Sequence, residues 1–306
     1  MGWLIGTYDA SVQDGTGSGV YAADELPGQA HLAVALPSPS FLLGDGHLVH
    51  ATLEGEGRVV TLRGDAVERS VDAGGASPCH LSRLGDRLVV ANYGSGTLAV
   101  VGADGPEQVL DGEGGGPNPA QDGPHAHSSL VVGDRLLSAD LGDDVVWVHA
   151  IEGGALRRTG AIRFEPGSGP RDLALLPSGD VLMLAELDGT LHLIRGDEVV
   201  SSVVVPGFTP GDHAGSIAVR DGVVYCGVRG SNRIAVVRLG DDALVPALDI
   251  DCGGDWPRHL ALDGDTLHVA NQRSHDVATF RIGGDGIPEQ TGSTPVPSPA
   301  FVLHVT

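Results

Sequence analysis

The chain repeats one motif from end to end, in units of roughly 44 residues, which is the length of a β-propeller blade. Each unit has a proline, one or two polar residues, a short apolar run, a Gly/Asp turn, a second run ending in Asn or Asp, and a third run. Segments 78–92 and 257–271 align without a gap. The leading prolines are Pro39, Pro78, Pro124, Pro170, Pro257 and Pro299, and segment 213–219 is a unit without one.

Seven units predict an all-β, seven-bladed β-propeller with four antiparallel strands in each blade. The apolar runs are short, β-branched and bounded by Gly, Asp or Asn, and no long segment has a helical period, so little helix is expected. The last unit supplies only segment 300–306, whereas segments 2–8, 19–23 and 31–35 near the N-terminus resemble strands. We therefore expect the N- and C-terminal strands to share one blade and close the ring, with residues 1–306 as a single domain. The alternative, a β-sandwich, would not explain seven copies of one motif.

The amino-acid composition argues against several classes of binding partner. The formal net charge is −22, and all 18 basic residues are arginine, so the acidic surface argues against nucleic-acid binding. The N-terminal sequence has no signal-peptide pattern, and no apolar run is long enough for a membrane span. The three cysteines lack metal-site spacing and fit reduced thiols, so we expect a cytoplasmic protein without membrane contact, as a monomer or weak dimer.

Polar residues recur at two places in each unit that a propeller would bring to one face of its axis. One place follows the leading proline, and the other is the end of the second strand. The residue types there diverge from unit to unit, which indicates a site rather than a repeated structural feature. The first group is Ser40, Cys79, His80, His125, His127, Arg171, Asp172, His213, Arg258 and His259; the second is Asn92, Tyr93, Asp140, Glu186, Arg229, Asn271 and Gln272.

Three of the few basic residues, Arg171, Arg229 and Arg258, fall in these places and would form a cationic well with the histidines. Because guanidinium groups bind carboxylate and phosphate through paired hydrogen bonds, the predicted ligand is a small anion. Arg258 could equally pair with a neighbouring carboxylate to stiffen a blade.

Two interpretations remain open for the roles of several candidate site residues. His125 and His127 could bind a metal with Asp140 or Glu186, but catalysis or substrate binding is favoured, and no metal or cofactor is expected. Glu186, between apolar neighbours, is either paired with an arginine or held at a raised pKa for proton transfer, near Arg171 or Arg229 in both cases.

Asn92 and Asn271 precede turns, so they are expected first as strand-end caps and second as substrate ligands. His213, His125, Arg258 and Asp140 complete the candidate substrate-binding set.

These residues resemble the seven-bladed propeller lactonases of the bacterial 6-phosphogluconolactonase type, a family that includes the carboxy-muconate cyclases. The similarity runs in family order along nearly the whole chain. The matching segments are Ile5-Gly-Thr-Tyr8, Pro78-Cys-His-Leu-Ser82, Val90-Ala-Asn-Tyr-Gly-Ser95, Gln121-Asp-Gly-Pro-His-Ala-His-Ser128, Ala139-Asp-Leu-Gly142, Gly167-Ser-Gly-Pro-Arg171, Ala185-Glu-Leu187, Val228-Arg-Gly230, Trp256-Pro-Arg258 and Val269-Ala-Asn-Gln272.

The resemblance implies a lactone hydrolase of the pentose phosphate pathway. Its catalytic group would be His127 (or His125), Arg171, Glu186 and Arg229. The chain departs from the family pattern at Ala185 and Val228, where asparagine is usual, and at Asp172, where histidine is usual.

Three functions follow as hypotheses. The first is hydrolysis of an anionic sugar lactone, most of all 6-phosphogluconolactone, with His127, alone or with Glu186, as base and Arg171 and Arg229 holding the anion. The second is a carboxy-muconate cycloisomerase, and the third is a propeller that binds a ligand without catalysis.

Overall fold

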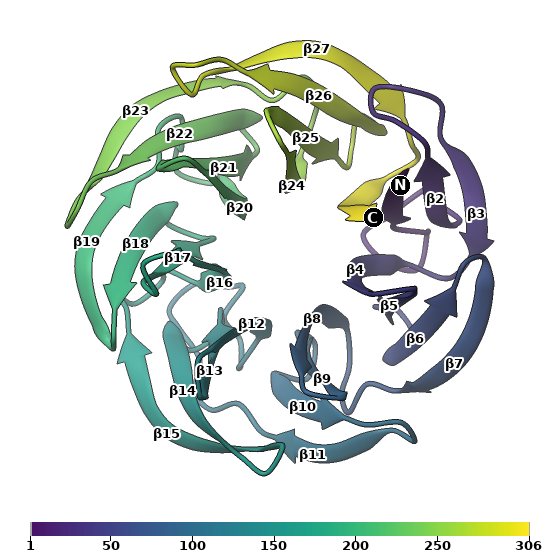
Figure 1. Ribbon diagram of the computed structural model, residues 1–306. Helices are drawn as coiled ribbons and strands as arrows, with labels where there is room; N and C mark the ends of the chain where they lie inside the picture. The colour runs from purple at the N-terminus through teal and green to yellow at the C-terminus, as the bar shows by residue number, and fades with distance from the viewer. Residues whose placement is uncertain (1, 306) are drawn as a thin grey trace.

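The computed structural model describes residues 2–305 and shows seven four-stranded antiparallel sheets arranged around a central axis (Figure 1). We number the blades in chain order. Blade 1 holds β4 (Pro39–Asp45), β5 (Leu48–Leu53), β6 (Arg58–Arg63) and β7 (Ala66–Asp72). Blade 2 holds β8 (Pro78–Leu84), β9 (Arg87–Asn92), β10 (Thr97–Val101) and β11 (Pro106–Leu110). Blade 3 holds β12 (Ala126–Val132), β13 (Arg135–Asp140), β14 (Val145–Glu152) and β15 (Ala155–Arg163).

The remaining blades follow the same plan. Blade 4 holds β16 (Pro170–Leu175), β17 (Val181–Ala185), β18 (Thr190–Arg195) and β19 (Glu198–Val204). Blade 5 holds β20 (His213–Arg220), β21 (Val223–Arg229), β22 (Arg233–Leu239) and β23 (Leu244–Asp251). Blade 6 holds β24 (Pro257–Asp263), β25 (Thr266–Asn271), β26 (Asp276–Ile282) and β27 (Pro288–Pro295). Blade 7 holds β28 (Pro299–Val305), β1 (Gly2–Thr7), β2 (Gly19–Ala23) and β3 (His31–Ala35).

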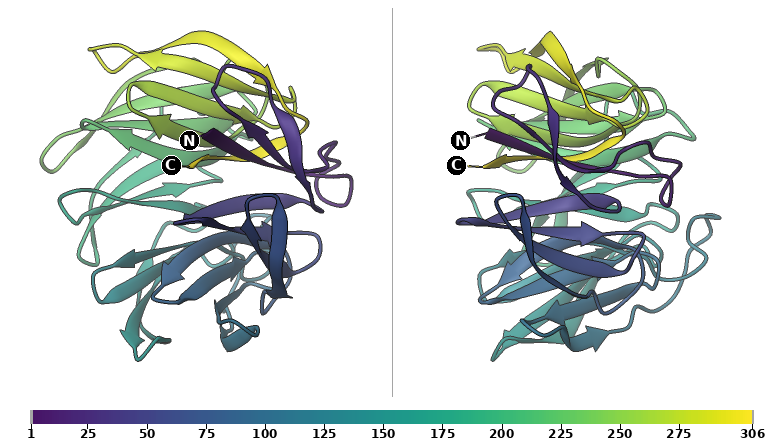
Figure 2. Two further views of the ribbon diagram at one scale, coloured as in Figure 1. Left: turned by 45° about the vertical axis from the view of Figure 1, so that its right-hand side comes forward. Right: turned by 90° about the vertical axis from the view of Figure 1, so that its right-hand side faces the viewer.

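Blade 7 joins the two ends of the chain, as the sequence predicts. The C-terminal strand β28 is its innermost strand and pairs antiparallel with β1, from Gly2 opposite Val305 to Gly6 opposite Phe301. The termini therefore lie side by side in all three views (Figures 1 and 2). The prediction of seven four-stranded blades closed by the terminal strands is confirmed. Within residues 2–305 every regular element is a strand, and no helix of a length and apolarity fit to cross a membrane occurs.

The apolar core is divided among the interfaces between blades. Seven clusters of buried side chains can be traced, and each draws its members from two neighbouring blades, including the pair formed by blades 7 and 1 and the pair formed by blades 6 and 7. The second and third strands are buried on both faces, as in β21, whose seven residues are all buried, whereas the outermost β11 is largely exposed. Burying both faces explains why the middle strands are continuous apolar runs rather than alternating ones.

Each innermost strand carries a β-bulge near its start. In blade 4, for example, Pro170 pairs with Ala185 and Asp172 pairs with Leu184, which leaves Arg171 without a partner. A bulge adds one residue to a strand and redirects its side chain. Register shifts at the corresponding point occur in all seven blades, and in blade 5 two residues, Gly215 and Ser216, are left unpaired.

Candidate active site

Three positions repeat around the axis and supply most of the polar residues there. The lead-in position precedes the inner strand, the bulge position is the unpaired residue in that strand, and the exit position ends or follows the second strand. In six blades the exit residue donates its backbone N–H to the lead-in carbonyl, and in blade 5 the two residues pair in the ladder.

In the order of blades 1 to 7, the lead-in residues are Ser38, Ser77, His125, Gly169, His213, Trp256 and Ser298. The bulge residues are Ser40, Cys79, His127, Arg171, Gly215 with Ser216, Arg258 and Ala300. The exit residues are Glu54, Tyr93, Leu141, Glu186, Arg229, Gln272 and Tyr8.

Glu186 is the centre of a charged cluster that joins blades 4 and 5. Its Oε2 lies 2.7 Å from Arg171 Nε and 2.8 Å from Arg229 Nη2, and its Oε1 lies 3.1 Å from His213 Nδ1. Both arginines are 5 % exposed. We call these four residues the Glu186 network. The sequence prediction that Glu186 lies beside Arg171 or Arg229 holds for both.

The two arginines also bind the backbone of the inner strand of blade 5. Arg171 Nη1 donates to the Gly215 carbonyl, and Arg229 donates from Nη2 to the Ala214 carbonyl at 2.9 Å and from Nε to the His213 carbonyl at 3.3 Å. Each guanidinium is thus shared between one carboxylate and main-chain oxygens, so the Glu186 network fixes β20 in place as well as gathering charge.

The network determines which groups are ionised. Burial raises the pKa of Glu186, but Arg229, His213 and Arg171 outweigh it and hold the pKa well below its usual value. Burial lowers the pKa of Arg229 to about 10, with Arg171 and Arg258 adding to that effect against the attraction of Glu186. Glu186 is therefore an anion at neutral pH, and the alternative of a raised pKa for proton transfer is wrong.

His213 is the imidazole that contacts Glu186. Its Nδ1 faces Glu186 Oε1 at 3.1 Å, and its side chain is 36 % exposed, the most open of the four members of the Glu186 network. A carboxylate that accepts from one ring nitrogen fixes the tautomer and leaves the other nitrogen free to take a proton. Trp256 is next to it, with ring centroids 6.0 Å apart, and also lies 5.6 Å from the Arg229 guanidinium carbon.

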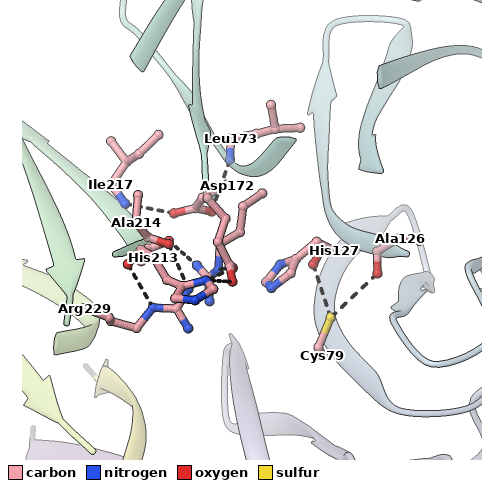
Figure 3. A network of polar contacts seen from close by, with 12 residues as sticks. Cys79, Ala126, His127, Asp172, Leu173, His213, Ala214, Ile217 and Arg229 are labelled. Carbon is pink, nitrogen blue, oxygen red and sulfur yellow. Dashed lines mark hydrogen bonds and ion pairs between the residues drawn. The ribbon is translucent and has the colours of Figure 1, made fainter. Parts of the chain in front are cut away.

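His127 approaches the same cluster from blade 3. In Figure 3 its ring points toward His213 and Arg229 and away from Cys79, whose sulfur faces the backbone carbonyls of Ala126 and His127. Burial, reinforced by Arg171, lowers the pKa of His127 well below its usual value, so the imidazole is neutral near pH 7. Burial also raises the pKa of Cys79 to about 12, which keeps that thiol protonated and removes it as a nucleophile.

A cavity of about 210 Å³ follows the axis, and all seven inner strands contribute to its wall. Arg171 belongs to both the cavity and the Glu186 network, and His127, which also lines the cavity, points toward that network, so the two are continuous. The remaining lining residues are Ser40, Phe41, Cys79, His80, Asp172, Leu173, Ser216, Ile217, Arg258, His259, Ala300 and Phe301.

Four polar residues in this wall link one blade to the next. His80 Nδ1 accepts from Ser129 N, Asp172 Oδ2 from Ile217 N, Ser216 Oγ from Leu260 N and His259 Nδ1 from Val302 N, at 2.8 to 3.4 Å. We call these four residues the acceptor ring. The divergence of His80, Asp172 and His259, from which the sequence predicted a binding site, has a structural interpretation: each accepts a backbone N–H of the neighbouring inner strand.

Three predicted substrate ligands lie one residue away from the exit position. Asn92 and Asn271 are fully buried and donate from Nδ2 to the carbonyls of Ala73 and Cys252, and Asp140 accepts backbone N–H groups from the turn around Gly142. Successive side chains of a strand point to opposite faces, so a shift of one residue turns these groups away from the axis. The structure thus places them in the turns, in agreement with the strand-end interpretation of Asn92 and Asn271.

His125 is at the lead-in position, outside the inner strand. Its ring stacks on Tyr93 at 4.4 Å, with Nδ1 2.9 Å from the Tyr93 carbonyl and Nε2 2.9 Å from Asp122. Both ring nitrogens are occupied, so His125 does not pair with His127 on a metal. Among residues 2–305, no three His, Cys, Asp or Glu side chains lie together as metal ligands would.

Sequence reasoning did not single out Tyr8, Glu54 or Trp256. Tyr8 donates from its hydroxyl to Glu54 Oε2 at 2.9 Å, and the Arg258 guanidinium carbon lies 4.8 Å from the Tyr8 ring centre. Trp256 has a φ of 69°, at a position where other blades with positive φ have serine or glycine. A gapless alignment of exit and lead-in positions would have revealed all three.

Comparison with known proteins identifies the family of this chain. The sequence model of a family described as a lactonase with a seven-bladed β-propeller matches residues 3–304. A 6-phosphogluconolactonase of Bacillus subtilis is 30 % identical over 264 residues, which cover 75 % of this chain and 74 % of that protein.

Two solved structures share the fold. A putative 6-phosphogluconolactonase from Bacteroides fragilis superimposes with a TM-score of 0.88 at 24 % identity, covering 100 % of this chain and 98 % of that one. A periplasmic gluconolactonase from Pseudomonas aeruginosa gives 0.87 at 23 % identity, covering 100 % and 99 %. With the match over residues 3–304, the closed ring and the arginine–glutamate–histidine cluster at its axis, this chain belongs to the seven-bladed β-propeller lactonase family.

Proposed function

We propose that this protein hydrolyses the lactone of an acidic sugar, and that its substrate is 6-phosphogluconolactone, which it opens to 6-phosphogluconate in the pentose phosphate pathway. The Bacillus subtilis relative carries the name of that activity. The single observation that carries the mechanism is the contact of His213 Nδ1 with Glu186 Oε1 at 3.1 Å, with Glu186 held by two buried arginines.

His213 acts as the general base in this mechanism. Its Nε2 takes a proton from water as the water oxygen attacks the lactone carbonyl carbon. Glu186 keeps Nδ1 protonated and stabilises the imidazolium that forms. The ring C–O bond then breaks, and the departing oxygen takes the proton back from His213, giving a carboxylic acid and a hydroxyl group.

The cationic groups stabilise the charge that develops on the carbonyl oxygen. Arg171 borders both the cluster and the cavity, and a fixed positive charge there lowers the energy of the tetrahedral intermediate. His127, neutral and facing the same space, contacts the lactone directly. His213 replaces His127, the base expected from the sequence, because Glu186 orients the His213 ring.

The test is hydrolysis of 6-phosphogluconolactone by protein treated with a chelator, measured as acid release above the spontaneous rate. His213→Gln is expected to lower kcat about 100-fold or more, since a positioned general base contributes on that order. His31→Gln, on the exposed edge strand β3, is the matched control and keeps the wild-type rate. Hydrolysis by the wild type no faster than the spontaneous reaction would refute the proposed function.

The cycloisomerase alternative would use the Arg171 and Arg229 pair to hold the carboxylates of a carboxy-muconate. Arg171 and Arg229 are both bound to Glu186, which favours lactone opening over that reaction. Absorbance of a carboxy-muconate incubated with the protein distinguishes the two. A platform without catalysis would instead keep its ligand affinity in the His213→Gln variant and show no turnover in the wild type.

We also propose a cytoplasmic location and a monomer or weak dimer. The location is supported by three cysteines that are all buried free thiols and by a substrate that carries a phosphate. The large exposed apolar side chains are distributed over several blades. They are Leu32 on β3, Val67 on β7, Val109 on β11, Leu175 on β16, Val245 on β23, and Val199, Val200 and Val204 on β19. Cell fractionation tests the first proposal, and light scattering across concentrations tests the second.

A further inference from the structure

Arg258 differs from the other two axial arginines in having no anionic partner. It stands at the bulge position of β24, is 9 % exposed and lines the axial cavity. Arg171 and Arg229 each contact Glu186 Oε2, but across residues 2–305 no carboxylate oxygen comes within 4.0 Å of the Arg258 guanidinium. An isolated buried charge is costly unless a counter-ion compensates it.

The groups nearest to Arg258 hold it in place without neutralising it. The Tyr8 ring lies 4.8 Å from its guanidinium carbon, a distance at which the ring face attracts a cation. The nearby carboxylate of Glu54 accepts the Tyr8 hydroxyl at 2.9 Å. Burial disfavours the charged form, but Tyr8, Glu54 and Glu186 favour it, and the pKa of Arg258 lies above its usual value. The guanidinium is therefore a fixed cation.

The remainder of the cavity wall is almost free of charge. Burial, with help from Arg171, lowers the pKa of His80 and of His259 to about 3, so both imidazoles are neutral. Phe41 and Phe301 pack against them. The one carboxylate in the wall is Asp172, whose oxygens accept the N–H groups of Ile217 and Leu173. An anion entering the cavity thus meets the two guanidiniums in its wall, and only that of Arg258 is free of a carboxylate.

The cavity joins the free guanidinium to the reacting end of the site in one continuous space. Its volume is about 210 Å³, and Arg171, His127 and Arg258 all line it. A phosphate or carboxylate beside Arg258 would therefore leave the lactone ring near Arg171 and His127.

We propose that Arg258 binds the oxyanion substituent of the substrate, a phosphate or a carboxylate, inside the axial cavity, and thereby makes the enzyme select acidic over neutral sugar lactones. This inference rests on the proposed function. In this proposal Arg258 recognises the anion. Arg171 and Arg229 hold Glu186 and stabilise the charge on the reacting carbonyl.

The experiment compares Arg258→Gln with the wild type on three lactones: 6-phosphogluconolactone, glucarolactone with its carboxylate, and neutral gluconolactone. Loss of a charge-assisted contact is expected to raise KM for the acidic substrate about 10- to 100-fold and to leave kcat/KM for gluconolactone within about threefold. The acidic lactone that suffers the larger loss identifies the anion. Arg258→Lys, which keeps the charge, recovers part of the selectivity.

Arg273→Gln is the matched control. This arginine also packs on an aromatic ring, with its guanidinium carbon 3.4 Å from the centre of Trp256, but it does not line the cavity. The selectivity of the Arg273→Gln variant for acidic over neutral lactones is expected to equal that of the wild type. Equal losses on acidic and neutral lactones in Arg258→Gln, or unchanged selectivity, would overturn the inference.

A second measurement does not depend on turnover. Inorganic phosphate is expected to raise the Tm of the wild type and of Arg273→Gln, and to have little effect on Arg258→Gln. If no lactone is hydrolysed but this difference is seen, the proposed function fails and the anion site stands. If hydrolysis is seen and the Tm difference is absent, the anion site fails alone.

Discussion

The Glu186 network and the acceptor ring are built from similar polar residues a few positions apart, yet they do different work. In the Glu186 network, charged side chains contact one another, and His213 remains open to solvent. In the acceptor ring, each side chain contacts a backbone N–H of the next blade. The difference teaches that variation at a repeated position is not by itself a sign of a binding site. What distinguishes the site is that its charged side chains contact one another as well as the backbone.

The substitution with the largest expected effect is Glu186→Gln, which tests how much the Glu186 network contributes to stability. The change leaves Arg171 and Arg229 buried beside a neutral amide, so we expect the free energy of unfolding to fall by about 3–5 kcal/mol. Urea denaturation measures the loss. Glu186→Asp keeps the charge and should recover part of the stability. A loss below about 1 kcal/mol would mean that the arginines are held mainly by the carbonyls of β20.

A smaller effect is expected from Ser216→Ala in the acceptor ring. The change leaves the buried N–H of Leu260 without its acceptor at 2.8 Å, which costs about 1–3 kcal/mol of unfolding free energy. Ser178→Ala is the control, because Ser178 accepts the N–H of Asp180 in an exposed turn where water can replace it. Equal stability losses in the two variants would contradict the interpretation that the acceptor ring stabilises the contacts between blades.

The third prediction concerns pH dependence and is measured as a slope rather than as a single loss of stability. His259 has a pKa of about 3 when folded, lowered by burial and by Arg171 and Arg258, against about 6.5 when unfolded. The unfolded chain therefore binds the proton first, so this residue's contribution to stability is complete above about pH 6.5 and is lost as the pH falls toward 3.

His259→Asn keeps an acceptor near Val302 N but does not titrate. Between pH 6 and 4 the wild type should lose up to about 1.4 kcal/mol per pH unit more than the variant, measured by urea denaturation at each pH. Carboxylates whose pKa is raised, such as Asp172, act in the opposite sense but are common to both proteins. Parallel pH profiles would contradict the prediction.

Much of the architecture could be predicted from the sequence because one motif recurs at a fixed spacing. The spacing gave the number of blades, and the incomplete last unit gave the shared blade. It also predicted that Arg171, Glu186 and Arg229 lie close together, because all three occupy equivalent places in the repeated motif of adjacent units.

What could not be predicted was the register within that frame. The bulge at the start of each inner strand adds a residue that the sequence does not mark, and in blade 3 the inner strand starts at Ala126 rather than at Pro124. His125 and His127 therefore fall into different positions, and Asp140 turns away from the axis. The partners of Arg258 depend on contacts between blades 6, 7 and 1, which no local pattern reports.

The sharing of every apolar cluster between two blades has a consequence for how the protein can come apart. A single cut in a loop between blades would leave all seven apolar clusters in place. Two cuts on opposite sides would divide the chain into two arcs, and the exposed apolar faces of each arc would fit those of the other. Such arcs are natural candidates for fragment complementation. Because Arg258, Glu186 and Glu54 belong to three different blades, neither arc alone could assemble the axial chemistry.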